Sequence, residues 1–189
     1  MRVQLILRKA EELDGELEII TTGRMTNLAM AVMKDTKLPK KVKRVVTMGG
    51  TLYAKGNVNP YAEANIQGDA HASDIVFRAG FHLTLVGLDV TMKTFITDRE
   101  ITNLCKYCKE DCKDIAEYIK NVLKLYFEFH RVSEGMVEQC VVHDPLAVLI
   151  AEDPSLGEYQ MIRAGVEYEH EKYKGMITYD VGFLPTLDR

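Results

Sequence analysis

The amino-acid sequence predicts an α/β fold with a mainly parallel sheet flanked by helices. Two observations predict it. Short β-branched segments alternate with segments of helical periodicity, and their spacing is that of strand–helix–strand units. Residues that start or stop such elements (glycine, asparagine and aspartate) stand at the expected boundaries. We expect residues 1–189 to form a single domain, because no linker, repeat or low-complexity segment divides the chain.

Turn and cap residues divide the first half of the chain into elements. Asp14-Gly15 breaks the first helix, and Gly49-Gly50 stops the second strand. Thr26 or Asn27 is placed to cap the second helix. In order, the expected elements are the end of a helix at 5–13, a strand at 17–21, a helix at 28–34, a strand at 42–48, a polar segment at 51–68, a helix capped by Asp69 that runs through Ala79, and a strand at 82–90.

The second half of the chain continues with longer helices and ends in a hairpin. The periodicity predicts a helical region at 98–129, in one or two helices, then a helix at 144–151 and two hairpin strands at 161–168 and 172–179. The pattern opens partway and stops without a closing helix, so we expect a sheet that is incomplete at both ends. Because a parallel sheet is normally covered on both faces, we expect a partner subunit or a separate segment to cover the bare surface.

Composition argues against several classes of function. The 189 residues include 24 Lys+Arg and 28 Asp+Glu, a net charge of −4, with no basic block of the kind that nucleic acid binding requires. No segment approaches the roughly 18–20 apolar residues of a membrane span, and no secretory signal pattern is seen. Four cysteines are too few for a disulfide scaffold and fit a reducing compartment. We expect a cytoplasmic protein without nucleic acid or membrane partners.

The polar segment at 56–65 holds the best candidates for binding a ligand. It follows the strand that ends at Met48, and ligands of open α/β sheets bind beyond the carboxyl ends of strands. The amides of Asn57 and Asn65 both donate and accept hydrogen bonds, whereas the carboxylate of Glu63 only accepts. In an extended backbone Glu63 and Asn65 project to the same side, which suits the neighbouring hydroxyls of a sugar. The alternative is an ordinary loop whose asparagines bond to their own backbone.

Two further segments are expected at the same edge of the sheet. His143-Asp144-Pro145 opens a helix, so Asp144 is either an N-cap or a ligand for a metal or hydroxyl. Histidine as a residue type titrates near neutral pH, so His143 suits general acid catalysis. Thr21-Thr22-Gly23 follows a strand, where a bent backbone turns a carbonyl oxygen toward a hard cation. The three segments together predict one cavity shaped for a pentose.

Several short motifs, each weak alone, occur over most of the chain. They are Thr22-Gly23…Thr26-Asn27, Met48-Gly49-Gly50, Gly56-Asn57 with Pro60…Glu63-x-Asn65, Val86-Gly87-Leu88-Asp89-Val90-Thr91 and His143-Asp144-Pro145. In this order they resemble the motifs of the inosine-uridine preferring nucleoside hydrolases. The resemblance runs from about Leu17 to Thr178.

The resemblance implies a calcium-dependent enzyme of purine and pyrimidine salvage that hydrolyses the N-glycosidic bond of ribonucleosides to ribose and free base. In that family calcium holds the ribose hydroxyls and the attacking water, and carboxylates stabilise positive charge on the sugar. The residues carried over are the Thr22 carbonyl and Asp144 as metal ligands, Asn57, Glu63, Asn65 and Asp144 as binders of substrate hydroxyls, Met48 packed under the sugar, and His143 as the acid that protonates the leaving base.

Two features depart from the family pattern. The Asp-rich loop D-x-D-x-x-x-D-D, which supplies the general base and most calcium ligands, is absent from these residues, so the calcium site is expected to be incomplete. Ala64 stands where relatives often carry Phe, so base preference is not carried over. We expect a truncated member, inactive or nearly so alone, that forms a homo-oligomer or joins a complementing N-terminal segment. The alternative is a non-catalytic nucleoside- or ribose-binding subunit.

The middle of the chain leaves two pairs of interpretations open. Cys105, Cys108 and Cys112 have the spacing of a zinc or iron–sulfur site, but they also fall on one helical stripe, which favours core packing. Tyr126, Phe127, Phe129 and His130 are either core residues or a cover over the base.

Overall fold

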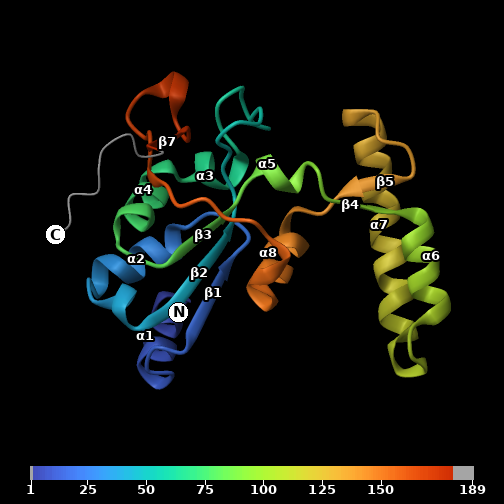
Figure 1. Ribbon diagram of the computed structural model, residues 1–189, viewed down its shortest axis with the longest axis horizontal. Helices are drawn as coiled ribbons and strands as arrows, with labels where there is room; N and C mark the ends of the chain where they lie inside the picture. Colours follow the sequence, from blue (N-terminus) through green and yellow to red (C-terminus); the bar gives the residue numbers. More distant parts are fainter. Residues whose placement is uncertain (1, 181–189) are drawn as a thin grey trace. The chain divides into compact units, whose positions relative to one another are not determined.

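The structure is a computed structural model that describes residues 2–180 (Figure 1). They fall into two compact units. Among the described residues, unit 1 comprises residues 2–90 and 144–180, and unit 2 comprises Thr91–His143. Two compact units do not by themselves make two domains, so the single domain stays a prediction.

The observed elements follow the predicted alternation. The α-helices are α1 (Arg2–Glu12), α2 (Thr26–Lys34), α3 (Ala64–Gly68), α4 (Ala70–Arg78), α5 (Leu88–Thr91), α6 (Asp98–Tyr107), α7 (Lys113–Glu134) and α8 (His143–Glu152). The strands are β1 (Leu17–Thr21), β2 (Val42–Met48), β3 (Leu83–Val86), β4 (Phe95–Thr97), β5 (Gln139–Val141), β6 (Arg163–Val166) and β7 (Ile177–Asp180). Short 3-10 turns are η1 (Leu38–Lys40), η2 (Glu110–Cys112), η3 (Pro154–Leu156) and η4 (Glu171–Tyr173).

A parallel sheet of strand order β1-β2-β3 forms the centre of unit 1. Ile19 pairs with Val45, and Thr47 pairs with Leu85, so all three strands run in register toward one carboxyl edge. Parallel neighbours require a crossover between them, and α2 and α4 supply the helices of these crossovers. The predicted α/β class with a parallel sheet is confirmed.

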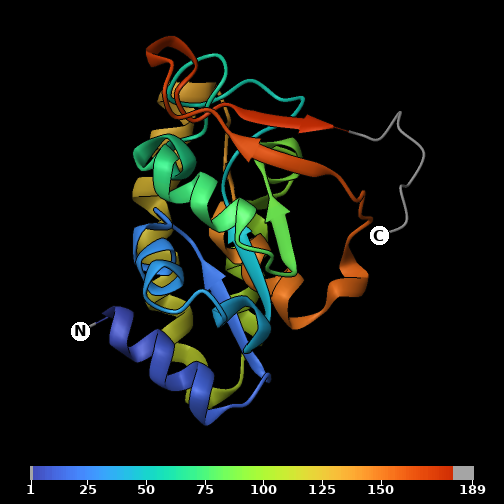
Figure 2. The ribbon, with the colours of Figure 1, turned by 90° about the vertical axis from the view of Figure 1, so that its left-hand side faces the viewer.

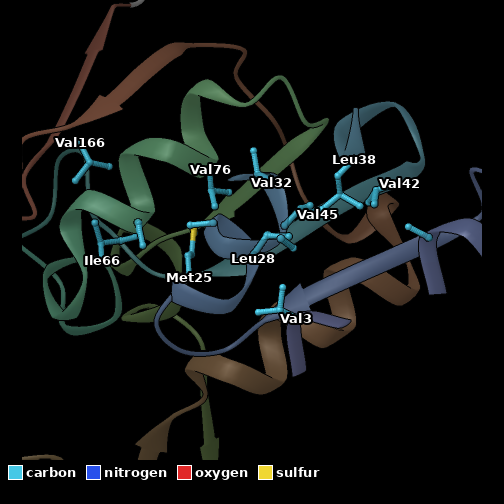
Figure 3. Close-up of a cluster of buried hydrophobic side chains, with 14 of the residues drawn as sticks. Val3, Met25, Leu28, Val32, Leu38, Val42, Val45, Ile66, Val76 and Val166 are labelled. Atoms are coloured by element: carbon cyan, nitrogen blue, oxygen red, sulfur yellow. The ribbon is translucent and has the colours of Figure 1, made fainter. Parts of the chain in front are cut away.

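One face of the sheet packs against α1, α2 and α4 (Figure 2). Val3 of α1, Leu28 of α2 and Val76 of α4 are buried together with Val45 of β2 (Figure 3). Each helix contributes one apolar stripe at helical spacing, as an amphipathic helix against a sheet does. Burial of this cluster is the main source of stability for unit 1.

The other face of the sheet carries α8. Side chains alternate along a strand, so Arg44 and Val46 point away from the cluster that contains Val45. The guanidinium of Arg44 donates a hydrogen bond to the carbonyl of Ala151 near the end of α8 and forms an ion pair with Glu18 of β1. Both faces of the three-stranded sheet are therefore contacted by helices.

The predicted C-terminal hairpin is confirmed, with β6 and β7 pairing antiparallel from Arg163↔Asp180 to Val166↔Ile177. Its anchor is Asp74 of α4, a buried carboxylate that accepts a hydrogen bond from the backbone N–H of Val166 at 2.9 Å. The Arg78 side chain forms an ion pair with the same carboxylate. The hairpin is thereby fixed to the helical layer of unit 1.

Unit 2 consists of a helical pair and a short antiparallel ladder. The helical region predicted at 98–129 is confirmed as two helices, α6 and α7. Thr97 and Glu100 form a capping box at the start of α6, and α7 ends at Gly135, whose φ of +69° is in the left-handed region. Strands β4 and β5 pair from Phe95↔Val141 to Thr97↔Gln139.

Two local predictions are wrong. The third strand was expected at 82–90 but ends at Val86, because Gly87 turns the chain and α5 begins at Leu88. The N-cap of α2 is Met25, which makes no side-chain cap, whereas the Thr26 hydroxyl donates instead to Asp69 of the next crossover. Asp69 does cap α4 as predicted, because its carboxylate accepts from the Ala72 N–H at 3.1 Å.

Candidate functional site

The carboxyl edge of the β1-β2-β3 sheet is the candidate site. Thr21 ends β1, Met48 ends β2 and Val86 ends β3, and their registers place these ends side by side. The hydroxyls of Thr21 and Thr47 are 2.6 Å apart, which joins the first two strands at this edge. All candidate residues of unit 1 follow one of these strand ends or the start of α8.

Glu63 is the most buried polar residue of the loop, with 2% of its surface exposed. Its Oε2 accepts hydrogen bonds from the backbone N–H of Gly50 at 2.8 Å and of Ile66 at 3.2 Å. Its Oε1 accepts from the N–H of Asn65 at 2.9 Å. The carboxylate therefore caps α3 and ties the end of β2 to that helix. Its binding of ribose hydroxyls stays a prediction.

Asn65 sits directly over the end of β2. Its Nδ2 donates to the carbonyl of Met48 at 3.1 Å and lies 3.3 Å from the Met48 sulfur. The expected extended arrangement of Glu63 and Asn65 is wrong, because Glu63 caps α3 and Asn65 lies within it. The two donors of the amide point at β2, and its Oδ1 has no hydrogen-bond partner within residues 2–180.

Asn57 holds the turn that precedes Glu63. Its Oδ1 accepts from the backbone N–H of Ala64 at 2.9 Å, while the Asn57 side chain is exposed. No hydrogen bond of its Nδ2 occurs in the described part of the chain. Asn59 serves its own loop, since its Oδ1 accepts from the N–H groups of Tyr61 and Ala62. The amide donors of Asn57 are thus not used by the loop itself.

Asp89 holds the start of the same loop from the other side. Its carboxylate accepts hydrogen bonds from three consecutive backbone N–H groups, those of Leu52 at 2.9 Å, Tyr53 at 2.7 Å and Ala54 at 2.8 Å. Burial of the carboxyl raises its pKa, but the three backbone donors outweigh that effect, so the pKa of Asp89 lies below its ordinary value. Asp89 therefore has a structural role, because it fixes the start of the loop.

The C-terminal hairpin packs against the loop that follows β2. Gly50 has a φ of +75°, and a Cβ at this position would come within 2.3 Å of the Ile177 Cδ1 atom on β7. Ala62 pairs with Met176 in an isolated bridge, and the ring of Tyr61 contacts that of Tyr173 edge-on at 5.1 Å. The loop geometry depends on residues far away in the sequence.

Thr22 and Asp144 are exposed at the ends of their elements. Thr22 directly follows β1, next to the paired residues Thr21 and Thr47, and thus lies at the carboxyl edge. Asp144 stands in the first turn of α8. Their role as metal or hydroxyl ligands stays a prediction.

His143 belongs to unit 2 and is the residue before the chain enters unit 1. Its Nδ1 lies 2.8 Å from the hydroxyl of Thr91, which is fully buried. This contact fixes the orientation of the imidazole relative to the end of α5. The predicted gathering of His143 with the sugar-binding residues stays a prediction.

The described residues do not by themselves complete a metal centre. No group of three or more His, Cys, Asp or Glu side chains within residues 2–180 is arranged to hold a metal ion. Cys105 lies in α6, Cys108 caps that helix and Cys112 lies in η2, so the expected single helical stripe is wrong. The chain departs from helix after Tyr107, and these three thiols are half-buried.

The loop, the strand ends and the buried caps define an α/β protein with a candidate polar ligand site at the carboxyl edge of a parallel sheet, where open α/β enzymes bind small molecules. A sequence profile described as "Inosine-uridine preferring nucleoside hydrolase" matches residues 1–184. The chain belongs to this family.

Named relatives agree with the family. The chain is 37% identical over 153 residues to uridine nucleosidase 1 of Arabidopsis thaliana, covering 80% of this chain and 44% of that protein. It is 32% identical over 178 residues to the pyrimidine-specific ribonucleoside hydrolase RihA of Shewanella sp. strain ANA-3, covering 94% of this chain and 54% of that protein. The chain spans about half the length of the relatives that it matches.

Solved structures show the same fold. A plant nucleoside hydrolase, the PpNRh1 enzyme, superposes with a TM-score of 0.89 at 30% identity, covering 100% of this chain and 57% of that one. A purine-preferring ribonucleoside hydrolase from Gardnerella vaginalis superposes with a TM-score of 0.87 at 32% identity, covering 95% of this chain and 55% of that one.

A membrane-spanning helix is not found among residues 2–180, because none of their helices combines the length and the apolar character that a span requires.

Proposed function

We propose that the protein hydrolyses the N-glycosidic bond of ribonucleosides and that this chain supplies the sugar-binding part of the site. The observation that carries the proposal is the fixed loop at the carboxyl edge, where Glu63 joins Gly50 to α3 and Asn65 bonds to Met48. Rigid placement of amide groups beside a strand end is what recognition of neighbouring hydroxyls requires.

The ribose would lie against Met48, with its hydroxyls bonded by the side chains that still have hydrogen-bonding capacity. The Nδ2 of Asn57 would donate to one hydroxyl and the Oδ1 of Asn65 would accept from another. Glu63 would act mainly by holding both residues in place, because its carboxylate already serves three backbone N–H groups.

The leaving base needs a proton, because a nucleobase departs poorly as an anion. We assign that proton to His143, whose ring is oriented by the Thr91 hydroxyl. Water adds its oxygen to the anomeric carbon of ribose as the bond to the base breaks. One proton of that water is released, His143 recovers from solvent the proton that it gave to the base, and the products are ribose and the free base. Asp144 would bind a ribose hydroxyl in the first turn of α8.

Calcium would need ligands beyond those that we assign in this chain. Thr22 and Asp144 would contribute one carbonyl and one carboxylate, whereas calcium takes roughly six to eight oxygen ligands. We therefore propose that this polypeptide alone binds calcium weakly and turns over nucleosides slowly or not at all. A complementing N-terminal segment or a second copy would supply the remaining ligands.

A cellular compartment and a pathway are also part of the proposal. We propose a cytoplasmic protein of nucleoside salvage; its four cysteines are free thiols, as a reducing compartment favours.

Ribose and nucleoside binding by the full chain tests the proposal. Calorimetry with ribose, inosine and uridine is expected to detect binding, and Asn57→Ala is expected to weaken it about tenfold because one hydrogen bond to a hydroxyl is lost. Asn103→Ala, at an exposed position of α6, is the matched control and should leave binding unchanged. Equal affinity of the Asn57→Ala variant and the wild type would remove this loop from the site.

Turnover distinguishes an enzyme from a binding subunit. Release of free base from inosine or uridine is measured for the chain alone and after addition of an N-terminal segment from a full-length relative. Restored turnover supports the hydrolase, and its loss in His143→Ala supports the assigned acid. Binding without turnover in the complemented protein would favour the non-catalytic alternative.

A further inference from the structure

One face of α7 carries an apolar stripe that nothing in unit 2 covers. Its six side chains are between 49% and 79% exposed, and they are Ile115, Tyr118, Val122, Leu125, Phe129 and Val132. We call this set the α7 stripe. Ala116 and His130, on the opposite face of the helix, are almost fully buried. The face of α7 that packs within unit 2 is therefore a different one.

The spacing of the α7 stripe is that of a coiled-coil seam. Successive members are separated alternately by three and four residues, from Ile115 to Val132. A strict alternation of three and four is the heptad repeat, which keeps apolar side chains facing one partner helix along the whole length. An ordinary surface helix has its apolar residues on the face turned to its own core. This spacing points to another helix as the partner.

The order of side chains along the α7 stripe reads the same in both directions by size and type. It runs aliphatic, aromatic, aliphatic, aliphatic, aromatic, aliphatic. If two copies of α7 lie antiparallel about a two-fold axis, Tyr118 meets Phe129 of the second copy and Val122 meets Leu125 of the second copy. An isologous interface requires this kind of self-complementarity, because the same surface must fit itself.

The residues beside the stripe also suit an antiparallel pair. In that arrangement Asn121 lies opposite Glu128 of the second copy, so an amide faces a carboxylate twice about the axis. A parallel pair would instead place the acidic Asp114 beside the apolar Ile119 of the second copy. The antiparallel arrangement opposes no like charges along the seam and sets the two helix dipoles in opposite directions.

The size of the α7 stripe is close to what an association requires. Six large side chains that are 49–79% exposed amount to several hundred Å² of apolar surface, and a patch of about this size on a protein surface is often functional. A standard stable interface buries roughly 800 Å² on each partner. The stripe supplies most of that area before any contact from flanking residues is added.

We propose that the α7 stripe is a homodimer interface in which α7 pairs antiparallel with α7 of a second copy of this chain. The interface lies within unit 2, and its existence does not depend on hydrolase activity. The proposal identifies a surface for the homo-oligomer that the family resemblance implies.

Sedimentation equilibrium of the full chain across the micromolar range tests the proposal. The wild type is expected to reach twice the 21.4 kDa of one chain. Leu125→Glu is expected to weaken dimerisation by at least about a hundredfold, because it would bury an unpaired carboxylate. Thr102→Glu adds the same charge at an exposed site on α6 and should dimerise like the wild type. Circular dichroism establishes that both variants are folded.

Photo-crosslinking tests the orientation. Benzoylphenylalanine in place of Tyr118, with light- and heavy-isotope chains mixed, is expected to crosslink to the peptide that contains Phe129 of the other copy. Crosslinks to the peptide around residue 118 of the other copy would overturn the antiparallel pairing. A wild type that stays monomeric, a dimer that Leu125→Glu leaves intact, or a monomer that binds lipid vesicles through the stripe would overturn the proposed dimer.

Discussion

The Glu63 carboxylate accepts a hydrogen bond from the backbone N–H of Gly50 at 2.8 Å. Through this bond a helix cap in the polar loop also fixes the first turn after β2. A single side chain therefore connects the strand end, where Met48 lies, to α3, where Asn65 lies. The consequences of this connection can be measured without any substrate.

Removal of the Glu63 carboxylate should destabilise unit 1. Glu63→Ala leaves the N–H groups of Gly50, Asn65 and Ile66 without their acceptor in a buried environment. We expect a loss of about 2–4 kcal/mol in the free energy of unfolding, measured by urea denaturation. Glu158→Ala, in an exposed loop, is the control and should change little. A loss equal to that of the control would contradict the capping role.

Gly50→Ala should be destabilising for two separable reasons. The φ of +75° disfavours any Cβ, and that Cβ would come within 2.3 Å of the Ile177 Cδ1 atom. We expect a loss of about 2–4 kcal/mol in unfolding free energy. Ile177→Val removes the clashing methyl, so in a double-mutant cycle the two substitutions should be less costly together than the sum of their separate effects.

Gly15 is a control for Gly50, because a substitution there tests the backbone strain without a side-chain clash. Its φ is +90° and its Cβ would meet nothing within 4 Å, so Gly15→Ala should lose only about 1–2 kcal/mol from strain. Additivity of Gly50→Ala and Ile177→Val would show that contact with β7 does not constrain the loop.

Stability should depend on the ionisation of Asp89. Its pKa in the folded protein lies below the ordinary value of 3.8, so its carboxylate stabilises the fold above that value. This contribution should be lost as the pH falls from about 3.8 through the lower folded pKa, because the unfolded state then binds the proton first. Urea unfolding of wild type and Asp89→Asn across this range should give two curves that converge at low pH. Parallel curves would exclude this role.

The four cysteines should differ in reactivity. Cys140 is fully buried, and burial raises the pKa of its thiol to about 11, so little thiolate forms near pH 8. Cys105, Cys108 and Cys112 are half-buried. Reaction with Ellman's reagent should therefore show a slow phase that Cys140→Ala abolishes. Loss of a fast phase in that variant would contradict the burial of this thiol.

The sequence predicts the sheet better than the loop. The strands at 17–21 and 42–48 were expected at their observed bounds, because β-branched residues and terminal glycines mark them locally. α3 was not predicted, since its five residues are too few to show a helical period and the helix depends on the Glu63 cap. The position of the helix break after Tyr107 was not predicted either, because no glycine or proline marks it.

In the candidate site, too, residue types could be predicted from the sequence, whereas their contacts could not. Asn57, Glu63 and Asn65 were identified from residue type and position after a strand, but their hydrogen bonds go to backbone groups that no spacing rule indicates. Gly50 was expected only to stop a strand, whereas its conformation also makes room for Ile177. A contact between residues so distant in sequence leaves no local signal.

The seating of β7 on the loop also affects the order of events during synthesis on the ribosome. β1, β2 and β3 are complete once residue 86 has emerged, and all the strands that pair in this sheet lie within these residues. The loop that carries Asn57 and Glu63 lacks its contacts with the hairpin until Met176 and Ile177 have been synthesised. The nascent polypeptide therefore completes the three-stranded sheet before the loop is supported, and the loop reaches its final geometry only after β7 has been synthesised.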